Sequence, residues 1–176
     1  MHRRRFVMTG PAAIALAATS GPARAQQLIW QDITGPDGRY RLKMPRGYRF
    51  LHVPGHGGSM NSYVYMLPDK VALELVDFVP ASPHAVPTGS ALVTALEQAQ
   101  GGMMKSWPGS TVREQREITT GPLTGREFVL AVSGDRFVRG RLYLTPTAVY
   151  SLIAQGPMAG FGSPMVAEFF ASLRFG

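Results

Sequence analysis

The feature that most constrains the fold is the alternating stretch from Thr124 to Leu144, TGREFVLAVSGDRFVRGRLYL. On the two sides of Ser133-Gly134-Asp135, the even positions of residues 128–132 and 138–144 hold apolar residues or glycine, which is the period of a strand with one buried face. Both apolar sets can face one core only if the turn between the strands holds an odd number of residues. The sequence therefore predicts a hairpin with a three-residue turn, in which Glu127 lies directly opposite Arg141.

The second strand of this hairpin carries Arg139, Arg141 and Tyr143 on the face opposite its apolar side chains. One interpretation is a solvated sheet face with a cross-strand ion pair between Glu127 and Arg141, which stabilises the hairpin by about 0.2–1 kcal/mol. The other is a positive surface on which Arg139, Arg141 and Tyr143 bind an acidic partner or an anion. The sequence alone leaves both interpretations open.

Further strand patterns cover residues 29–45, 60–79, 111–119 and 148–156. A helix is expected from about Ser90 to Lys105, where apolar residues recur every three or four positions. A second helix follows Ser163-Pro164, an N-cap residue and then proline at the first helical position. Residues 51–59, with three glycines and a proline, are expected to form a loop. Strand-rich blocks interrupted by two helices favour an α+β fold, a largely antiparallel sheet with helices packed on it.

Residues 1–25 have the layout of a cleaved export signal, with a basic start, a short apolar stretch and the small residues Ala23 and Ala25 before the cleavage site. Arg3-Arg4-Arg5-Phe6-Val7 resembles the signal of the twin-arginine pathway. The general secretion pathway and an amphipathic helix retained in the mature chain are the alternatives. We expect cleavage near Ala25, a periplasmic or secreted location, and a mature chain of residues 26–176 that folds as a single domain.

The composition narrows the classes of function. The chain has a formal net charge of +7, but residues 1–25 contain four arginines and no acid, so residues 26–176 hold 14 basic and 11 acidic residues, a net charge of +3. This ordinary balance argues against nucleic-acid binding. The absence of cysteine excludes disulfides, thiol nucleophiles and cysteine metal ligands. No apolar stretch after residue 25 has the roughly 20 residues needed to span a membrane.

Motifs for catalysis are not found in the sequence. It contains no G-x-S-x-G nucleophile elbow, no phosphate-binding loop that ends in Gly-Lys-Ser/Thr and no H-E-x-x-H zinc motif. His52 and His56 are four residues apart, but the glycines and the proline around them argue against the helix that would align them as metal ligands. We therefore expect no cofactor and no metal, with a metal site at His52 and His56 as the alternative.

Several segments resemble one protein family. GRYRLKMPRGYRF at residues 38–50 is similar to the opening of PsbP-like domains. The segments GREFVLAV, RGRLYLTPTAVYSLIAQGP and AEFFASLRF resemble the second half of bacterial PsbP-related exported proteins. The resemblance implies the fold shared by PsbP and the Ran-binding protein Mog, an antiparallel sheet of about six or seven strands between helices. It also implies an accessory or binding role, and no site residue of the family maps onto this sequence.

The sequence therefore favours a non-catalytic accessory or binding module that is exported to the bacterial cell envelope. Its expected partner is an envelope protein, with an anionic or apolar small ligand as a further alternative. A periplasmic hydrolase or a small-ligand carrier stays open, because scattered serine, histidine and aspartate residues can converge in three dimensions. A deep cleft that gathers histidines with Asp77 or Glu74 would favour the hydrolase.

Overall fold

The computed structural model describes residues 28–35 and 38–176 of the chain. The predicted export signal, residues 1–25, lies outside these residues, so cleavage near Ala25 and the twin-arginine pathway stay predictions. In chain order the main elements are β1 (Trp30–Thr34), β2 (Tyr40–Pro45), β3 (Arg49–Gly55), β4 (Gly58–Met66), β5 (Ala72–Pro80), α1 (Ser90–Met104), β6 (Thr111–Thr120), β7 (Leu123–Val132), β8 (Arg136–Leu144), β9 (Val149–Pro157), α2 (Pro164–Ser172) and β10 (Arg174–Phe175).

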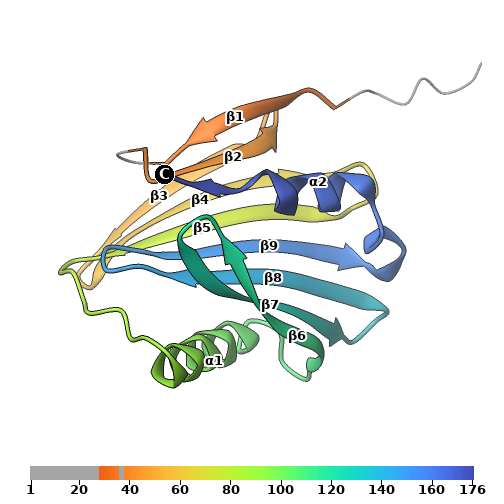
Figure 1. Cartoon of the computed structure of the whole chain (residues 1–176). Helices are drawn as coiled ribbons and strands as arrows, with labels where there is room; N and C mark the ends of the chain where they lie inside the picture. The colour runs from red at the N-terminus through yellow and green to blue at the C-terminus, as the bar shows by residue number, and fades with distance from the viewer. Residues whose placement is uncertain (1–27, 36–37) are drawn as a thin grey trace, which may run out of the picture.

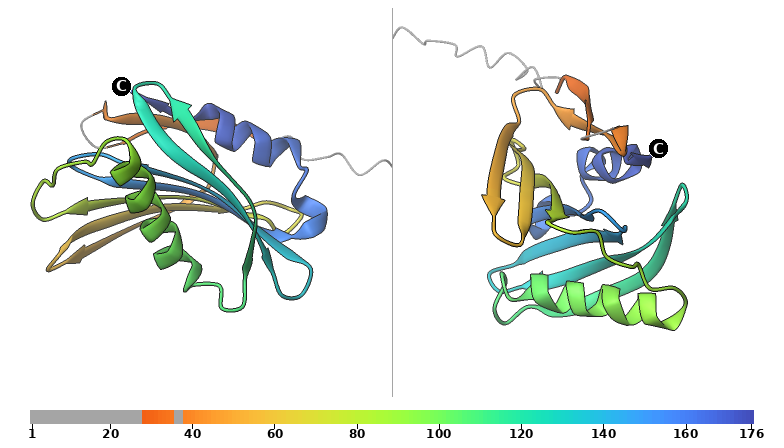
Figure 2. Two further views of the ribbon diagram at one scale, coloured as in Figure 1. Left: turned by 60° about the horizontal axis from the view of Figure 1, so that its bottom comes forward. Right: turned by 90° about the vertical axis from the view of Figure 1, so that its left-hand side faces the viewer.

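The strands form two antiparallel sheets, which are drawn in Figure 1. The larger sheet has seven strands in the order β3-β4-β5-β9-β8-β7-β6, and the smaller has three in the order β1-β2-β10. The large sheet curves around α2, while α1 lies on its outer face (Figure 2). The predicted α+β architecture, a mostly antiparallel sheet of six or seven strands packed between helices, is therefore confirmed.

Each face of the large sheet buries its own apolar core. On the outer face, Leu96 of α1 packs with Phe128, Leu130, Val138 and Leu142, which are even-numbered side chains of the predicted hairpin. On the inner face, α2 and the small sheet cover a larger core that includes Val166, Phe169 and Phe170 of α2. None of the helices in residues 28–35 and 38–176 is long and apolar enough to cross a membrane.

The register predicted for the central hairpin is confirmed. β7 ends at Val132 and β8 begins at Arg136, so the turn has three residues, and Glu127 faces Arg141 across the pair. Gly134 and Asp135 have φ angles of 75° and 54°, the left-handed geometry that closes a three-residue hairpin loop. The two predicted helices and the other predicted strands also form, although the small sheet and its last strand, β10, were not foreseen.

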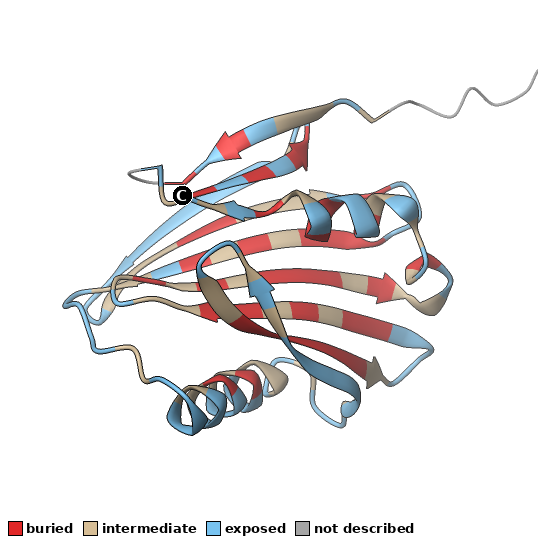
Figure 3. Cartoon of the chain, viewed as in Figure 1, coloured by how far each residue is buried: buried red, intermediate tan, exposed pale blue. Residues whose placement is uncertain are grey.

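The prediction of a loop at residues 51–59 is wrong. This segment contains most of β3, the turn at His56-Gly57 and the start of β4. Pro54 is tolerated because β3 is the edge strand of the sheet, where a missing N–H leaves no buried partner unpaired. Gly58 has a φ of 142°, and a Cβ there would lie 2.2 Å from the carbonyl oxygen of Val79. The glycines thus allow a tight turn between the two strands. Strand β3 itself is exposed along its length (Figure 3).

Candidate functional site

Three arginines converge on Glu127 on the inner face of the sheet. Oε1 of Glu127 accepts hydrogen bonds from Nε and Nη2 of Arg116, at 3.1 and 2.6 Å. Oε2 accepts one from Nη2 of Arg139 at 3.1 Å and one from Nε of Arg141 at 2.6 Å. The predicted pair between Glu127 and Arg141 is therefore confirmed, and Glu127 is only 5% exposed.

Helix α2 covers this arginine cluster, which we define as Arg116, Arg139, Arg141 and Glu127. The guanidinium carbons of Arg139 and Arg141 lie 4.7 and 5.2 Å from the centre of the Phe170 ring, within the range of cation–π attraction. Nη1 of Arg141 also donates a hydrogen bond to the Phe170 carbonyl at 2.8 Å. The interpretation of a solvated sheet face is therefore wrong for Arg139 and Arg141, because α2 packs on them.

Tyr143, the third predicted binding residue, has no exposed surface. Its hydroxyl group lies 2.8 Å from Oγ1 of Thr120, and burial raises the pKa of the Tyr143 phenol. Its ring packs edge-on against Phe175 of β10, with 4.9 Å between the ring centres. Tyr143 thus belongs to the core beneath the arginines, and binding of an acidic partner or an anion at Arg139, Arg141 and Tyr143 stays a prediction.

The arginine cluster changes the acidity of Glu127. Burial alone would raise its pKa, but hydrogen bonds from Arg141 and Arg116 and the charges of Arg141 and Arg139 outweigh burial and lower the pKa from 4.5 to about 2. A carboxylate that holds its proton less tightly in the folded chain stabilises the fold above its unfolded pKa. This stabilisation is lost as the pH falls from about 4.5 to about 2.

We predict that Glu127 contributes about 3 kcal/mol to the pH dependence of stability, since one pKa unit corresponds to about 1.36 kcal/mol. The free energy of unfolding should therefore fall between pH 4.5 and pH 2 by about this amount more in the wild-type chain than in Glu127→Gln. Urea denaturation at a series of pH values measures the difference. Parallel pH profiles for the two proteins would contradict the prediction.

The two histidines predicted as alternative metal ligands lie in different surroundings. Nδ1 of His52 is 2.7 Å from Oδ1 of Asn61, and Nδ2 of Asn61 donates to Oδ1 of Asp77 at 2.6 Å. Oδ2 of Asp77 accepts a hydrogen bond from the Tyr40 hydroxyl at 2.8 Å. His56 lies in the exposed turn between β3 and β4. Within residues 28–35 and 38–176, no three His, Cys, Asp or Glu side chains are grouped to hold a metal ion.

The hydrogen-bond chain from His52 ends at a carboxylate that solvent hardly reaches. Asp77 is 1% exposed, and both of its oxygens accept hydrogen bonds from protein groups. Burial and the neighbouring Asp77 carboxylate raise the pKa of the Tyr40 hydroxyl well above its ordinary value. Glu74, three residues before Asp77, points to the other face and accepts a hydrogen bond from Ser62. These hydrogen bonds therefore form a structural network that links β2 of the small sheet to β3, β4 and β5 of the large sheet.

Most of the exposed large apolar side chains lie on the strands at the β3 end of the large sheet. Five of the eight exposed large hydrophobic side chains of the described residues lie on β3, β4 and β5, namely Phe50, Leu51, Val53, Met66 and Phe78. Four of these five side chains point to the outer face, because His52, Asn61 and Asp77, which alternate with them, point to the inner face toward Tyr40. Of the four, Leu51, Val53 and Phe78 lie close together, and we call them the β3–β5 surface, whereas Met66 lies at the other end of β4.

A groove of about 530 Å³ adjoins the β3–β5 surface where α1 meets the sheet. Its walls include Met60, Val76, Met103, Trp107 and Ile153. Nε1 of Trp107 donates a hydrogen bond to Gln155 at 2.9 Å, which fixes the indole at the end of α1. Sequence analysis missed this surface because it treated β3 from Leu51 onward as a loop, although the apolar residues at positions 50, 51 and 53 were a usable signal.

Comparison of the fold with known proteins gives two informative structures. Cyanobacterial PsbP (CyanoP) from Synechocystis sp. PCC 6803 superposes with a TM-score of 0.61 and 9% sequence identity, over 90% of this chain and 99% of CyanoP. The chain has the PsbP-like fold. LpqN, described as involved in cell envelope biogenesis of Mycobacterium tuberculosis, matches this PsbP-like chain with a TM-score of 0.50 and 15% identity, over 86% and 92% of the two chains. No protein-family model and no curated protein sequence matches the chain.

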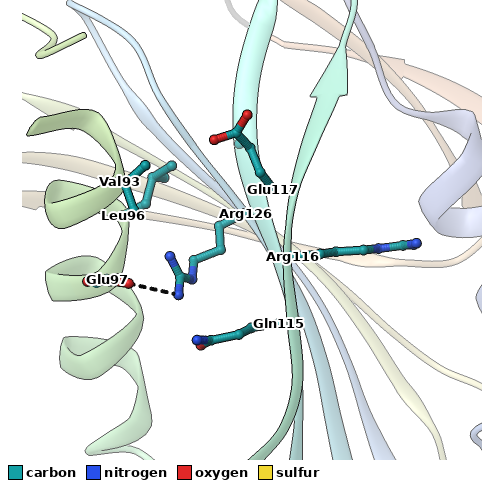
Figure 4. A pocket seen from close by; sticks show the side chains of 8 residues that line it. Val93, Leu96, Glu97, Gln115, Arg116, Glu117 and Arg126 are labelled. Carbon is teal, nitrogen blue, oxygen red and sulfur yellow. Dashed lines mark hydrogen bonds and ion pairs between the residues drawn. The ribbon is translucent and has the colours of Figure 1, made fainter. Parts of the chain in front are cut away.

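The PsbP-like fold also holds a smaller pocket of about 230 Å³ between α1 and the β6–β7 pair. Figure 4 shows Arg126 pointing into this pocket beside Gln115, whereas Arg116 projects to the opposite side of the strand. Nη2 of Arg126 forms an ion pair with Glu97 of α1 at 3.1 Å. The pair ties α1 to β7, so this pocket is a helix–sheet contact of the PsbP-like fold.

Proposed function

We propose that this chain is a non-catalytic accessory module, exported to the bacterial cell envelope, that binds a protein partner through the β3–β5 surface. The observation that carries the proposal is the gathering of Leu51, Val53 and Phe78 on one uncovered part of the outer face, where Val53 and Phe78 lie on either side of Met60. Exposed apolar side chains that gather in one place mark interaction sites more often than scattered ones do. Helix α1 covers β7, β8 and β9 and leaves this part of the sheet open.

Two further observations support an accessory role in the envelope. The PsbP-like fold is shared with LpqN, a protein involved in cell envelope biogenesis. The N-terminal sequence has the pattern of an export signal. The Asp77 carboxylate, which a hydrolase would need within reach of a substrate, is buried and engaged by Asn61 and Tyr40. These features favour binding over hydrolysis.

A small-ligand carrier is the second candidate, and the groove beside α1 is the observation that favours it. Its volume of about 530 Å³ lies in the range of about 300–1,000 Å³ that is typical of ligand sites. The wall combines apolar side chains with polar groups of Ser106, Ser151 and Gln155. An apolar ligand with one hydrogen-bonding end would fit this chemistry.

Native mass spectrometry of the chain, purified gently from the periplasm of its own host, separates the two candidates. The accessory module is expected to show the mass of residues 26–176 with no small molecule held. A mass excess that disappears on denaturation would overturn the proposal and assign the carrier role. A retained N-terminal segment would contradict cleavage near Ala25.

A further inference from the structure

The two edge strands of the large sheet differ in how well they are protected against pairing with another chain. β3 and β6 are the outermost strands, and an edge strand presents unpaired backbone N–H and C=O groups that can pair with another chain. Natural sheets block such pairing with charged side chains, bulges or covering elements. The comparison of β3 with β6 therefore indicates which edge is free to pair.

The β6 edge carries protective features. Its pairing with β7 shifts register between Val112 and Glu114, which places a bulge at Arg113. Arg113, Glu114, Arg116 and Glu117 put four charges in the middle of the strand. A bulge twists an edge away from straight pairing, and charged side chains disfavour docking of an apolar strand.

The β3 edge lacks most of these features. All seven of its residues are exposed, Arg49 is its only fully charged residue, and its pairing with β4 is continuous from Arg49 to Gly55. Phe50, Leu51 and Val53 are among the exposed large hydrophobic side chains. Pro54 lacks an N–H group, so it limits pairing only at the end of the strand near the turn.

The charge near β3 is of one sign. Arg49 lies on β3 and Arg46 in the turn before it, and residues 46–66 contain no acidic residue. In β5, Asp77 is buried and Glu74 is hydrogen-bonded to Ser62. A docked strand with acidic side chains would therefore meet complementary charge, whereas a second copy of β3 would bring the same positive charge.

From these observations we infer that β3 binds an extended segment of the partner by β-strand addition, and that this segment carries both apolar and acidic side chains on the face that meets Arg49, Leu51 and Val53. Backbone hydrogen bonds to the free edge would supply affinity, as in other complexes formed by strand addition. Arg49, Leu51 and Val53 lie two residues apart on the same face of β3, so every second side chain of the segment would meet them, with apolar side chains at Leu51 and Val53 and an acidic one at Arg49. This inference rests on the proposed function and adds the mode of binding and the chemistry of the partner.

The test uses two synthetic peptides as long as the seven residues of β3. In the valine–glutamate peptide, positions 1, 3, 5 and 7 are glutamate, valine, valine and glutamate, with threonine between them, so that a glutamate can meet Arg49 in either strand direction. In the valine–lysine peptide, lysine replaces both glutamates. With the mature chain, residues 26–176, the valine–glutamate peptide is expected to slow amide hydrogen exchange in β3 by about tenfold or more, a factor that corresponds to about 1.4 kcal/mol. Exchange in β6 is expected to stay unchanged. The valine–lysine peptide is expected to have no effect on either strand.

Val53→Lys is the variant that blocks the β3 edge, with Val112→Lys on β6 as its matched control. The two valines have nearly equal exposure, 41% and 40%, so neither change should unfold the chain. We expect Val53→Lys to weaken binding of the valine–glutamate peptide by about tenfold or more, or about 1.4 kcal/mol. Val112→Lys should bind the peptide like the wild-type chain, and thermal melts of both variants confirm folding.

Four results would overturn the inference. The first is no protection of β3 by the valine–glutamate peptide, and the second is equal protection by both peptides. The third is a concentration-dependent dimer that Val53→Lys abolishes, which would assign the edge to a second copy of the chain. A partner that contacts Phe78 in cells but does not slow amide hydrogen exchange in β3 would overturn this inference and leave the proposed function intact.

Discussion

Replacing Glu127 by alanine is expected to lower the free energy of unfolding by about 3–5 kcal/mol, the usual cost of removing one partner from a buried charge pair. The change would leave Arg116, Arg139 and Arg141 pointing at one another without the carboxylate that all three contact. The last two are largely covered by α2 through the Phe170 ring. Chemical denaturation of the mature chain measures the loss.

Glu168→Ala is the matched control for this prediction. Glu168 is also an acid in an ion pair, but it lies 3.7 Å from Lys43 and both side chains are about half exposed. Surface pairs of this kind contribute about 0–1 kcal/mol. Equal destabilisation by the two alanine variants would show that Glu127 does not act as the buried centre of the cluster.

Replacing Phe170 by alanine is expected to destabilise the fold by about 3–5 kcal/mol, the range for large aromatic side chains in a core. Phe170 is buried between the sheet and α2, with its ring centre 5.4 Å from that of Phe169. It also supports the guanidinium groups of Arg139 and Arg141. The melting temperature and the denaturant midpoint of the variant report the effect.

Two comparisons make the Phe170 prediction specific. Phe78→Ala removes the same side chain from an exposed position of β5, and it should cost at most about 1 kcal/mol. Phe170→Leu keeps most of the apolar volume but removes the aromatic face, so it should fall between alanine and the wild type. A Phe170→Ala variant as stable as Phe78→Ala would contradict the role of α2 as the cover of the arginine cluster.

The central hairpin could be predicted from the sequence because two physical constraints coincide there. Alternation fixes which side chains share a face, and the odd number of residues in the turn fixes the register. The contact between Glu127 and Arg141 could therefore be predicted from the sequence. Helix α2 was predictable for a similar reason, since Ser163-Pro164 marks its start and its apolar face faces the core.

Other parts depend on long-range contacts that no local pattern encodes. Arg116 reaches Glu127 only because the bulge at Arg113 sets the register of β6 on β7. The small sheet depends on Arg174 and Phe175, at the end of the chain, pairing with β2. At β3, proline and glycine composition predicted a loop, although an edge strand tolerates proline. The proposed binding surface was missed for this reason.

The central claim is that the β3–β5 surface holds a protein partner in the cell envelope. Its most direct test places a photo-crosslinking amino acid at Phe78 in one strain of the natural host and at Val112 in another, since these residues are 39% and 40% exposed. The account predicts a discrete crosslinked partner from position 78 and none from position 112. Equal crosslinking from both positions, or none from position 78, would contradict it.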